Sequence, residues 1–475
     1  MRKPRPYQVV AIKRLRSLDS ALLFVPLRGR KTAIIIDALR RGNRLPRMLV
    51  VSPLTVISVW QNELHAEGIS THVVVIRGTR KQKRNLMKTS GNVVFLTNYE
   101  TISAMRTDAA LYLSDCEAVV LDESTKIKHS YTNTAKAVCG SLRRIRRRFV
   151  LTGTPVTESL LDLWQQVDFV SPDLFHSSFF VWRETYFTPN YWGTKWAPNS
   201  DTKEELFSKI AFITVSVDEK AVGLGPEKDI PVSLELTPEM RSAYDQLQKS
   251  FTSTLARHGW ESNYIVAVME KLSQICSGFL SFGSHTRCKT RRTQPIEANI
   301  DAALLRAAPP KLRNALHRFP KSPKEAWLRE FLRNPEHLPV VVWFRHTVAQ
   351  RAITEVFDRA GLTWEKIDGQ TPPHKRENAL LWFSTGEVKC LAVQIDTAKY
   401  GISLAGAKHV VFYEPTWSFE AYYQARKRTQ KAGDASPTSF YLLSCKDTIE
   451  ELVYAVQAKK ENLHQRFREV LLQSA

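Results

Sequence analysis

Short apolar runs alternate with segments of helical periodicity throughout the first third of this 475-residue chain. The segments between the runs, such as Lys31–Arg40 and Val56–Glu67, repeat apolar residues at helical spacing. Strands that alternate with helices in this way form a parallel sheet with crossover helices. We therefore predict an α/β domain. Its expected strands are Ala21–Val25, Met48–Ser52, His72–Ile76, Val93–Thr97, Ala118–Leu121 and Phe149–Thr152.

A second α/β series begins near Val340 and contains the apolar runs VVVWF, CLAVQI, HVVFYE and FYLLS. Between the two series the sequence turns helical from Thr237, and a polar, basic stretch begins at Ser281 and has the composition of a loop or linker. A chain of this length is too long for one core. We expect an N-terminal lobe over 1–236, including an irregular, aromatic-rich extension over 176–236, then a helical insertion and linker over 237–339, and a C-terminal lobe over 340–475.

The charge of the chain favours a polyanionic partner. Lys and Arg number 68 against 47 Asp and Glu, which gives a formal net charge of +21. Such an excess raises non-specific affinity for nucleic acid, although a solvated basic surface would carry the same charge. The six cysteines form no C-x-x-C pair, which argues against a zinc module or a disulfide framework. The start of the sequence has no apolar block typical of a signal peptide, and no run has the length of a membrane span. We expect an intracellular, cytoplasmic protein without membrane contact.

A tight turn follows the last expected strand of the first series. Leu151 leads into Thr152, Gly153, Thr154 and Pro155, and an amphipathic helix comes next. Gly and Pro favour a tight turn, which presents two hydroxyl groups at the carboxyl end of a strand. In an open α/β sheet this edge is where ligands bind. Taken alone, a turn of this composition favours a purely structural role.

A second turn, PLRGRKT, has the position of a phosphate-binding loop. Such a loop follows a strand and ends in Lys-Ser/Thr at the start of a helix, where the Lys bridges phosphates and the hydroxyl holds magnesium. Lys31 and Thr32 have this place, but Arg30 stands where Gly is usual, and Gly29 is displaced by one residue. Either the side chain of Arg30 crowds the loop, or it points outward and the loop survives. Without further context the segment could be any basic turn.

A pair of carboxylates, Asp122 and Glu123, ends the apolar strand AVVLD. An Asp at this place can hold magnesium through water, and a Glu can polarise the attacking water. The alternative is an Asp-Glu-Ser turn that caps a helix.

These motifs together resemble the Swi/Snf-like ATPases of helicase superfamily two. The segment Leu151–Phe175, LTGTPVTESLLDLWQQVDFVSPDLF, is similar to the coupling motif of that family, which implies coupling roles for Thr152, Gly153 and Thr154. Arg5-Pro6-Tyr7-Gln8 resembles the N-terminal element in which the Gln amide, here of Gln8, reads adenine.

The segments LVVSPLTVISVWQNEL and FLTNYETI resemble the next two elements of the family, which lie at strand ends. The resemblance implies nucleic-acid contacts at Pro53, Thr97 and Tyr99.

The second half of the chain continues the resemblance in the same order. QIDTAKYGISLAGAKHVVFYEPTWS is similar to motif five, which implies a nucleic-acid contact at Thr397 and a nucleotide contact at Gly401. YYQARKRTQKAG is similar to the Gln-Ala-x-x-Arg-x-x-Arg-x-Gly motif, which implies a coupling role for Gln424 and catalytic roles for Arg428 and Lys431. Lys431 replaces the Arg that acts as a finger on the γ-phosphate, and Lys lacks the planar fork of Arg.

The resemblance implies two RecA-like parallel-sheet lobes that bind ATP and Mg²⁺, with Asp122 and Glu123 as catalytic groups. The implied function is an ATP-dependent translocase on double-stranded DNA; single-stranded DNA and RNA are less favoured. The departures at Arg30, Thr125 and Lys431 leave an alternative, a degenerate ATPase that clamps nucleic acid or a partner protein with little turnover. We expect a monomer, and a protein partner stays open.

Overall fold

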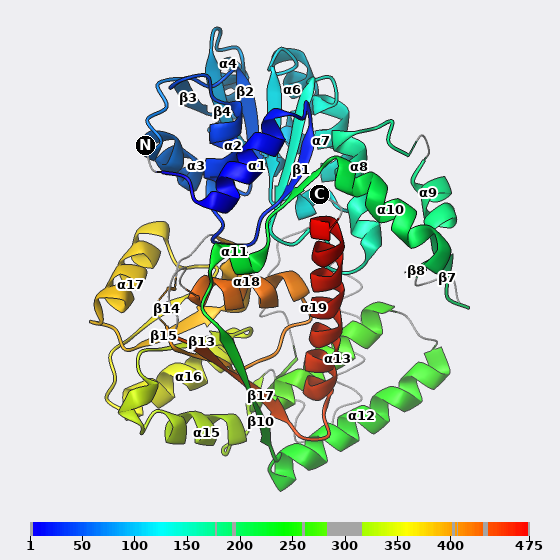
Figure 1. The fold of residues 1–475 in the computed structure, drawn as a ribbon. Coiled ribbons are helices and arrows are strands. Elements are labelled where there is room, and N and C mark those ends of the chain that lie inside the picture. Colours follow the sequence, from blue (N-terminus) through cyan, green and yellow to red (C-terminus); the bar gives the residue numbers. More distant parts are fainter. Residues whose placement is uncertain are drawn as a thin grey trace. The chain divides into compact units, whose positions relative to one another are not determined.

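The computed structural model describes residues 3–175, 178–191, 196–258, 262–282, 316–400, 404–405, 407–430 and 436–473 (Figure 1). The chain divides into two compact units. The first comprises Met1–Leu224 with Lys459–Ala475, and the second comprises Gly225–Ala458.

Within the described residues, the first unit is built on a seven-stranded parallel sheet with the strand order β3-β4-β2-β5-β6-β1-β9. The strands predicted for the first lobe are confirmed, and β9 is an additional edge strand. The strands are β1 (Ala21–Phe24), β2 (Met48–Ser52), β3 (His72–Val75), β4 (Val93–Asn98), β5 (Ala118–Asp122), β6 (Arg147–Thr152) and β9 (Thr214–Ser216).

Both faces of this sheet are buried, as is usual for parallel sheets with crossover helices. In β1, Leu22 and Phe24 belong to one hydrophobic cluster, whereas Ala21 and Leu23 belong to another. Helices α1 (Pro6–Arg16), α2 (Lys31–Leu39) and α3 (Ile57–Ala66) contribute to the second cluster. The first cluster takes residues from α4 (Arg80–Met87), α5 (Tyr99–Ala104), α6 (Arg106–Tyr112), α7 (Asn133–Leu142), α8 (Trp164–Val170), α9 (Phe179–Tyr186) and α10 (Ser200–Phe212).

The extension expected to be irregular over 176–236 holds regular elements. Besides α9, α10 and β9, it contains the antiparallel pair β7 (Phe187–Pro189) and β8 (Trp196–Pro198) and the short helix α11 (Glu219–Val222). Trp182 of this extension packs on aromatic residues inside and outside it: its ring centroid lies 5.0 Å from that of Phe187 and 5.3 Å from that of Trp164 on α8. This aromatic packing, which follows no simple period in the sequence, orders the segment.

The second unit contains, in its described part, a six-stranded parallel sheet with the order β10-β17-β16-β13-β15-β14. The strands are β10 (Glu227–Leu234), β13 (Val340–Phe344), β14 (Trp364–Ile367), β15 (Cys390–Gln394), β16 (His409–Phe412) and β17 (Thr438–Cys445). Its helices include α15 (Pro323–Phe331), α16 (Thr347–Arg359), α17 (Pro373–Thr385) and α18 (Phe419–Thr429). Helix α19 (Ile449–Gln473) begins in this unit, and its residues from Lys459 onward belong to the first unit. The predicted second α/β series is confirmed.

Strand β10 corrects the expected boundary of the first lobe. It pairs along its whole length with β17, so residues 225–236 lie in the second unit and not in the first. The expected helical insertion begins with α12 (Pro238–His258) and α13 (Ser262–Cys276), followed by the antiparallel pair β11 (Phe279–Ser281) and β12 (Leu316–Arg318). Most of the basic stretch that begins at Ser281 lies outside the described residues.

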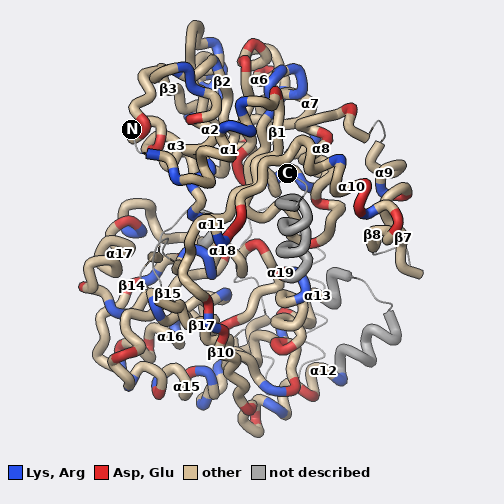
Figure 2. The backbone as a smooth tube through the Cα atoms, in the orientation of Figure 1, with Lys and Arg blue, Asp and Glu red and all other residues tan. Residues whose placement is uncertain are grey.

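Lys and Arg residues occur along the chain in both units (Figure 2). Among the described helices, none combines the length and the apolar character needed to cross a bilayer.

Candidate nucleotide-binding site

The loops that follow β1, β5 and β6 meet at one edge of the first sheet. These three strands are neighbours in the order β5-β6-β1 and run parallel, so their carboxyl ends lie side by side. The edge at the carboxyl ends of parallel strands is the usual ligand site of α/β sheets. The predicted phosphate loop, carboxylate pair and coupling turn therefore come together, as the sequence suggested.

The phosphate loop uses its glycine for close packing and its arginines for the left-handed turns. A Cβ atom on Gly29 would lie 2.4 Å from Cγ1 of Val25 and 3.0 Å from the carbonyl oxygen of Pro26, so a side chain there is excluded. Arg28 and Arg30, with φ of 71° and 55°, have the backbone conformation that usually requires glycine. In this loop the glycine is therefore required by close packing at position 29, and the left-handed backbone conformation falls on Arg28 and Arg30.

The side chain of Arg30 points away from the loop and toward α3. Its Nη2 donates to Oε1 of Glu63 on α3 and, at 3.0 Å, to Oε1 of Glu67, the residue that ends this helix. Glu67 is only 2% exposed. Of the two positions left open by the sequence for the side chain of Arg30, the structure has the one that points away from the loop.

Lys31, the first residue of α2, lies against the carboxylate pair. Its Nζ donates to Oε1 of Glu123 and lies 3.2 Å from Oδ1 of Asp122. Burial alone would lower the pKa of Lys31, but the charges of Asp122 and Glu123 outweigh it and raise the pKa above its usual value. The ammonium therefore stays charged at neutral pH.

Asp122 is held rigidly by residues of neighbouring elements. Its Oδ2 accepts from Nε1 of Trp60 at 2.9 Å, and its Oδ1 accepts from the backbone N–H of Glu123 at 2.9 Å. Tyr99 donates its hydroxyl to the carbonyl oxygen of Asp122 at 2.8 Å. Asp122 and Trp60 are fully buried. Glu123 itself has a φ of 52°, a strained value for a residue with a side chain.

Two of the predicted nucleic-acid contacts are buried here instead of presented to a ligand. The side chain of Tyr99 supports the backbone of Asp122 and is 1% exposed, and Thr97 is 0% exposed. Pro53 is half-buried and precedes a short 3₁₀ helix, Leu54–Val56, whose Leu54 is exposed. Pro53 stays a prediction.

The coupling turn is connected to the carboxylate loop by Gln166. Ser124 donates to Oε1 of Gln166 at 2.6 Å, and Nε2 of Gln166 donates to the carbonyl oxygen of Pro155 at 3.1 Å. Within the turn the hydroxyl of Thr152 accepts from the backbone N–H of Thr154 at 3.1 Å. Gly153 lies so close to β1 that a Cβ atom would be 3.3 Å from the carbonyl oxygen of Val25.

Gln8 has a structural partner at the start of α1. Its Oε1 accepts from the backbone N–H of Arg5 at 2.8 Å, and the residue is 2% exposed. Tyr7 beside it donates its hydroxyl to the carbonyl oxygen of Gly29 at 3.3 Å, which ties the N-terminal element to the phosphate loop.

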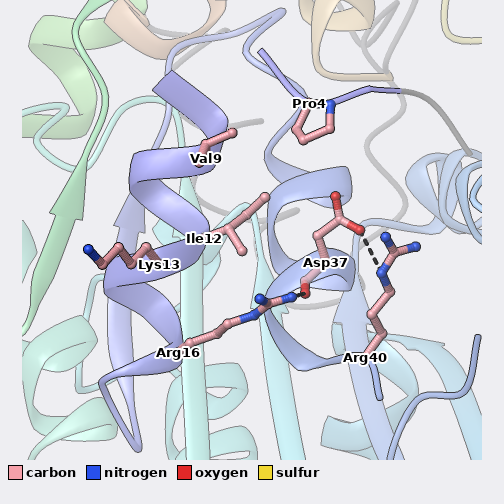
Figure 3. Close-up of a pocket in the computed structure, with 7 residues that line it drawn as sticks. All are labelled: Pro4, Val9, Ile12, Lys13, Arg16, Asp37 and Arg40. Carbon is pink, nitrogen blue, oxygen red and sulfur yellow. Dashed lines mark hydrogen bonds and ion pairs between the residues drawn. The ribbon is translucent and has the colours of Figure 1, made fainter. Parts of the chain in front are cut away.

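A pocket of about 300 Å³ lies between α1 and α2 (Figure 3). Asp37 and Arg40 form an ion pair of 2.9 Å there, and Nη2 of Arg16 donates to the carbonyl oxygen of Asp37 at 2.8 Å. Asp37 and Arg40 lie at the C-terminal end of α2, six and nine residues beyond Lys31, so the pocket is separate from the phosphate loop. Its contacts hold α1 beside α2. The pocket is lined by Pro4, Val9, Ile12, Lys13, Arg16, Asp37 and Arg40.

In the second unit the predicted motif YYQARKRTQKAG forms helix α18 and the residues after it. Nε of Arg426 donates to Oε2 of Glu227 at 2.9 Å, and Nζ of Lys427 donates to the other carboxylate oxygen at 2.6 Å. Asp229 lies 2.7 Å from Nη2 of Arg426. Strand β10 thus holds the helix by charged contacts that the sequence did not indicate.

The other predicted residues of this unit are placed as follows. Gln424 is buried and donates to Oε1 of Glu420 at 3.2 Å, whereas Arg428 is half-buried and its carbonyl oxygen accepts from the backbone N–H of Leu404 at 3.0 Å. Thr397, predicted to contact nucleic acid, is 1% exposed and donates to the carbonyl oxygen of Gln394 at 2.6 Å. Gly401 and Lys431 lie outside the described residues.

A buried charge cluster also lies at the carboxyl ends of β13 and β16. Nδ1 of His346 is 2.7 Å from Oε1 of Glu414, and Nε2 of His346 contacts Oε1 of Glu270 on α13. Burial would lower the pKa of His346, but the two carboxylates raise it to about 9. Arg345 forms an ion pair with Glu270, so the cluster fastens α13 to the second sheet.

The fold and the first site together define a nucleotide-binding α/β protein: a parallel sheet carries a Lys-Thr phosphate loop beside a carboxylate pair. The model of the SNF2-related domain matches residues 21–279, and that of the helicase conserved C-terminal domain matches residues 323–433. The chain therefore belongs to the SNF2-related, Swi2/Snf2-type family of ATP-dependent helicases.

Individual relatives are distant in sequence. The chain is 24% identical to an uncharacterized ATP-dependent helicase of Mycoplasma genitalium, MG018, over 97% of this chain and 42% of the relative. It is 22% identical to the human DNA repair and recombination protein RAD54B, over 88% of this chain and 48% of the relative. The chain thus spans less than half the length of these curated relatives. The SWI2/SNF2 ATPase core of Sulfolobus solfataricus, solved in complex with dsDNA, is 20% identical with a TM-score of 0.43, over 99% of this chain and 93% of that one.

Sequence reasoning did not find Trp60, Glu63, Glu67, Gln166 or Glu227. One signal pointed toward two of them: an arginine at a glycine position needs a partner, and Glu63 and Glu67 are spaced to lie on one face of α3.

Proposed function

We propose that this chain is an ATP-dependent motor that moves on double-stranded DNA. The observation that carries the proposal is the contact of Lys31 with Asp122 and Glu123 at the carboxyl edge of the first sheet. Phosphate binding, metal binding and water activation need these three residue types within reach of one another. Family membership supports ATP as the nucleotide.

The resting ion pair indicates how binding and hydrolysis are connected. ATP would draw the ammonium of Lys31 from Glu123 toward the β- and γ-phosphates, because these carry more negative charge than one carboxylate. Glu123 would then accept a proton from the attacking water as the bond between the γ-phosphorus and the bridging oxygen breaks. ADP and inorganic phosphate are the products.

The chain also offers fitting ligands for a magnesium ion. Asp122 and the hydroxyl of Thr32 are the expected ligands, since oxygen donors suit this ion, and the carboxylates already attract the ammonium of Lys31. Bound Mg²⁺ would neutralise charge that develops on the phosphate oxygens. By family resemblance, Arg428 and Lys431 would stabilise the same charge, and Thr152 to Thr154 would transmit the nucleotide state through Gln166.

Duplex DNA is the proposed track because the net charge of +21 favours a polyanion, and because the relatives include a DNA repair and recombination protein. The test is ATP hydrolysis by the purified protein alone and with duplex DNA, single-stranded DNA or RNA. Stimulation by duplex DNA is the expected result. Stimulation by RNA alone would show that the track is RNA and not duplex DNA. ATP binding without turnover under every condition would favour the alternative, a degenerate ATPase that clamps nucleic acid or a partner protein.

Two substitutions identify the site. Lys31→Ala should abolish ATP binding, because the phosphate charge loses its partner, whereas Glu123→Gln should bind ATP and fail to hydrolyse it. Lys136→Ala, an exposed lysine on α7, is the control and should behave as the parent. Binding by calorimetry and phosphate release give the two readouts. Equal turnover by Lys31→Ala and the parent would place the phosphate site elsewhere.

A further inference from the structure

We propose that Glu63 and Glu67 are positioning residues for phosphate binding, because they hold the guanidinium of Arg30 away from the loop and keep that loop in its left-handed turn. Neither acid contacts the place expected for the phosphates directly. They act through Arg30, the residue that caps the N-terminus of α2. The inference rests on the proposed function, since it concerns the same nucleotide site.

The backbone of Arg30 is the first part of the argument. Its φ of 55° and ψ of 47° place it in the left-handed region, which is unfavourable for a residue with a Cβ atom. Lys31 and Thr32 follow directly, so this turn sets the direction in which α2 begins. A side chain that is anchored can hold such a turn, whereas an unanchored one leaves the backbone free to relax.

The side chain of Arg30 is anchored by two carboxylates, those of Glu63 and Glu67. Glu63 lies on α3 and Glu67, four residues later, is the C-cap of this helix, and like charges at this spacing repel each other unless a cation lies between them. Arg30 supplies that cation: its Nη2 contacts both carboxylates. Arg30 reaches them from a loop 33 residues earlier in the chain.

The burial of Glu67 is unfavourable for a charged side chain, and no contact within α3 compensates for it. Glu67 is 2% exposed, and within the described part of the chain its Oε2 has no hydrogen-bond partner. A buried carboxylate oxygen without a partner is unfavourable, so stability alone is a poor reason for an acid at this position. We infer that the acid is present to hold Arg30 away from the anion site, because a released guanidinium would be drawn toward the phosphates and would displace the loop.

The test uses the full chain and measures ATP binding by calorimetry. In the variant with both Glu63→Gln and Glu67→Gln, the dissociation constant should rise about tenfold, as expected when the competent loop is populated about one time in ten. Adding Arg30→Gly to this variant should restore binding to within about twofold of the parent, since glycine adopts the left-handed turn without an anchor. A matched pair, Glu100→Gln with Glu117→Gln, removes two exposed acids of the same unit and should leave binding unchanged.

Restoration of ATP binding by Arg30→Gly distinguishes two explanations. If the two acids only stabilised α3, Arg30→Gly would not restore binding in the double-acid variant. Unchanged or tighter binding in the double-acid variant, or failure of Arg30→Gly to restore binding, would overturn the inference. Thermal unfolding checks that each variant folds. If the double-acid variant does not fold, Glu63→Gln alone should show a smaller loss with the same rescue, and absence of either effect would again overturn the inference. Equal binding by Lys31→Ala and the parent would instead show that the proposed nucleotide site is wrong.

Discussion

At the scale of single residues, His346 shows how burial and charge oppose each other in the second unit. Both of its ring nitrogens face carboxylates, so the imidazole is protonated at neutral pH and donates on both sides. Burial would raise the pKa of Glu270 and Glu414, but His346 lowers the pKa of each to about 2. The cluster is therefore a cation between two anions over a wide range of pH.

This arrangement predicts a loss of stability in alkali. The pKa of His346 is raised to about 9 from an ordinary value of 6.5, so its contribution is complete below pH 6.5 and disappears as the pH rises through 9. The carboxylate contributions disappear only as the pH falls toward 2. Thermal unfolding of the parent between pH 6 and 10 should show the alkaline loss, and His346→Gln should lower the midpoint at pH 6 and flatten the curve.

His374→Gln, an exposed histidine on α17, is the matched control and should follow the parent at every pH. Parallel curves for the parent and His346→Gln would contradict the role given to the cluster.

The sequence predicted the charged residues of the first site better than the residues that hold them in place. Lys31, Asp122 and Glu123 could be recognised because residue type and position at a strand end are both visible in the sequence. Tyr99 also stood at a strand end, but its hydroxyl is used by the backbone of Asp122, a contact between elements 23 residues apart. Such partners depend on three-dimensional packing, which no local pattern encodes.

At the scale of elements, strands with apolar runs were predictable, including the edge strand β3, whereas the edge strands β9 and β10 were not. Apolar runs that the layers on both faces bury form most of the central strands, namely β1, β2, β4, β5, β6, β13, β15 and β16. Strand β10 alternates exposed and half-buried residues, EKDIPVSL, and β9 has three residues. Both lie at sheet edges, where neighbouring strands and not their own composition determine their place.

The charged contacts of β10 with α18 give a prediction for Glu227. In Glu227→Gln, Asp229 stays beside Arg426, but Arg426 and Lys427 lose the mostly buried carboxylate that they share, and we expect this loss to lower the free energy of unfolding by about 3 kcal/mol. Arg428 on the same helix should also lose its fixed position, so kcat for ATP should fall about tenfold while KM changes little, since each factor of ten corresponds to about 1.4 kcal/mol of transition-state stabilisation. Chemical denaturation and steady-state kinetics with duplex DNA measure the two effects.

Glu235→Gln is the control for this experiment. Glu235 follows β10 directly and forms an exposed ion pair with Lys446, with 72% of its side chain accessible. Exposed pairs contribute little, so this variant should match the parent. An unchanged kcat in Glu227→Gln would show that α18 is positioned by other contacts.

At the scale of the whole molecule, the net charge of +21 predicts how the protein binds DNA. Neutralised phosphates release counterions, so affinity should fall steeply with salt, by about 10³-fold between about 50 and 200 mM for about six phosphate contacts. Affinity should be similar for unrelated duplexes, because backbone contacts carry no base information. Salt titrations on two unrelated duplexes measure both properties. A flat salt response, or strong preference for one duplex, would contradict the prediction.

One consequence of the Arg30 contact concerns how such sequences change over evolutionary time. If the carboxylates are present because the loop carries an arginine, substitutions at positions 30 and 67 are not independent. Relatives with glycine at the first position should tolerate uncharged residues at the second, and relatives with arginine should retain an acid there. A lineage could then cross from one state to the other only through an intermediate with a weakened site, which would make the pair change together or not at all.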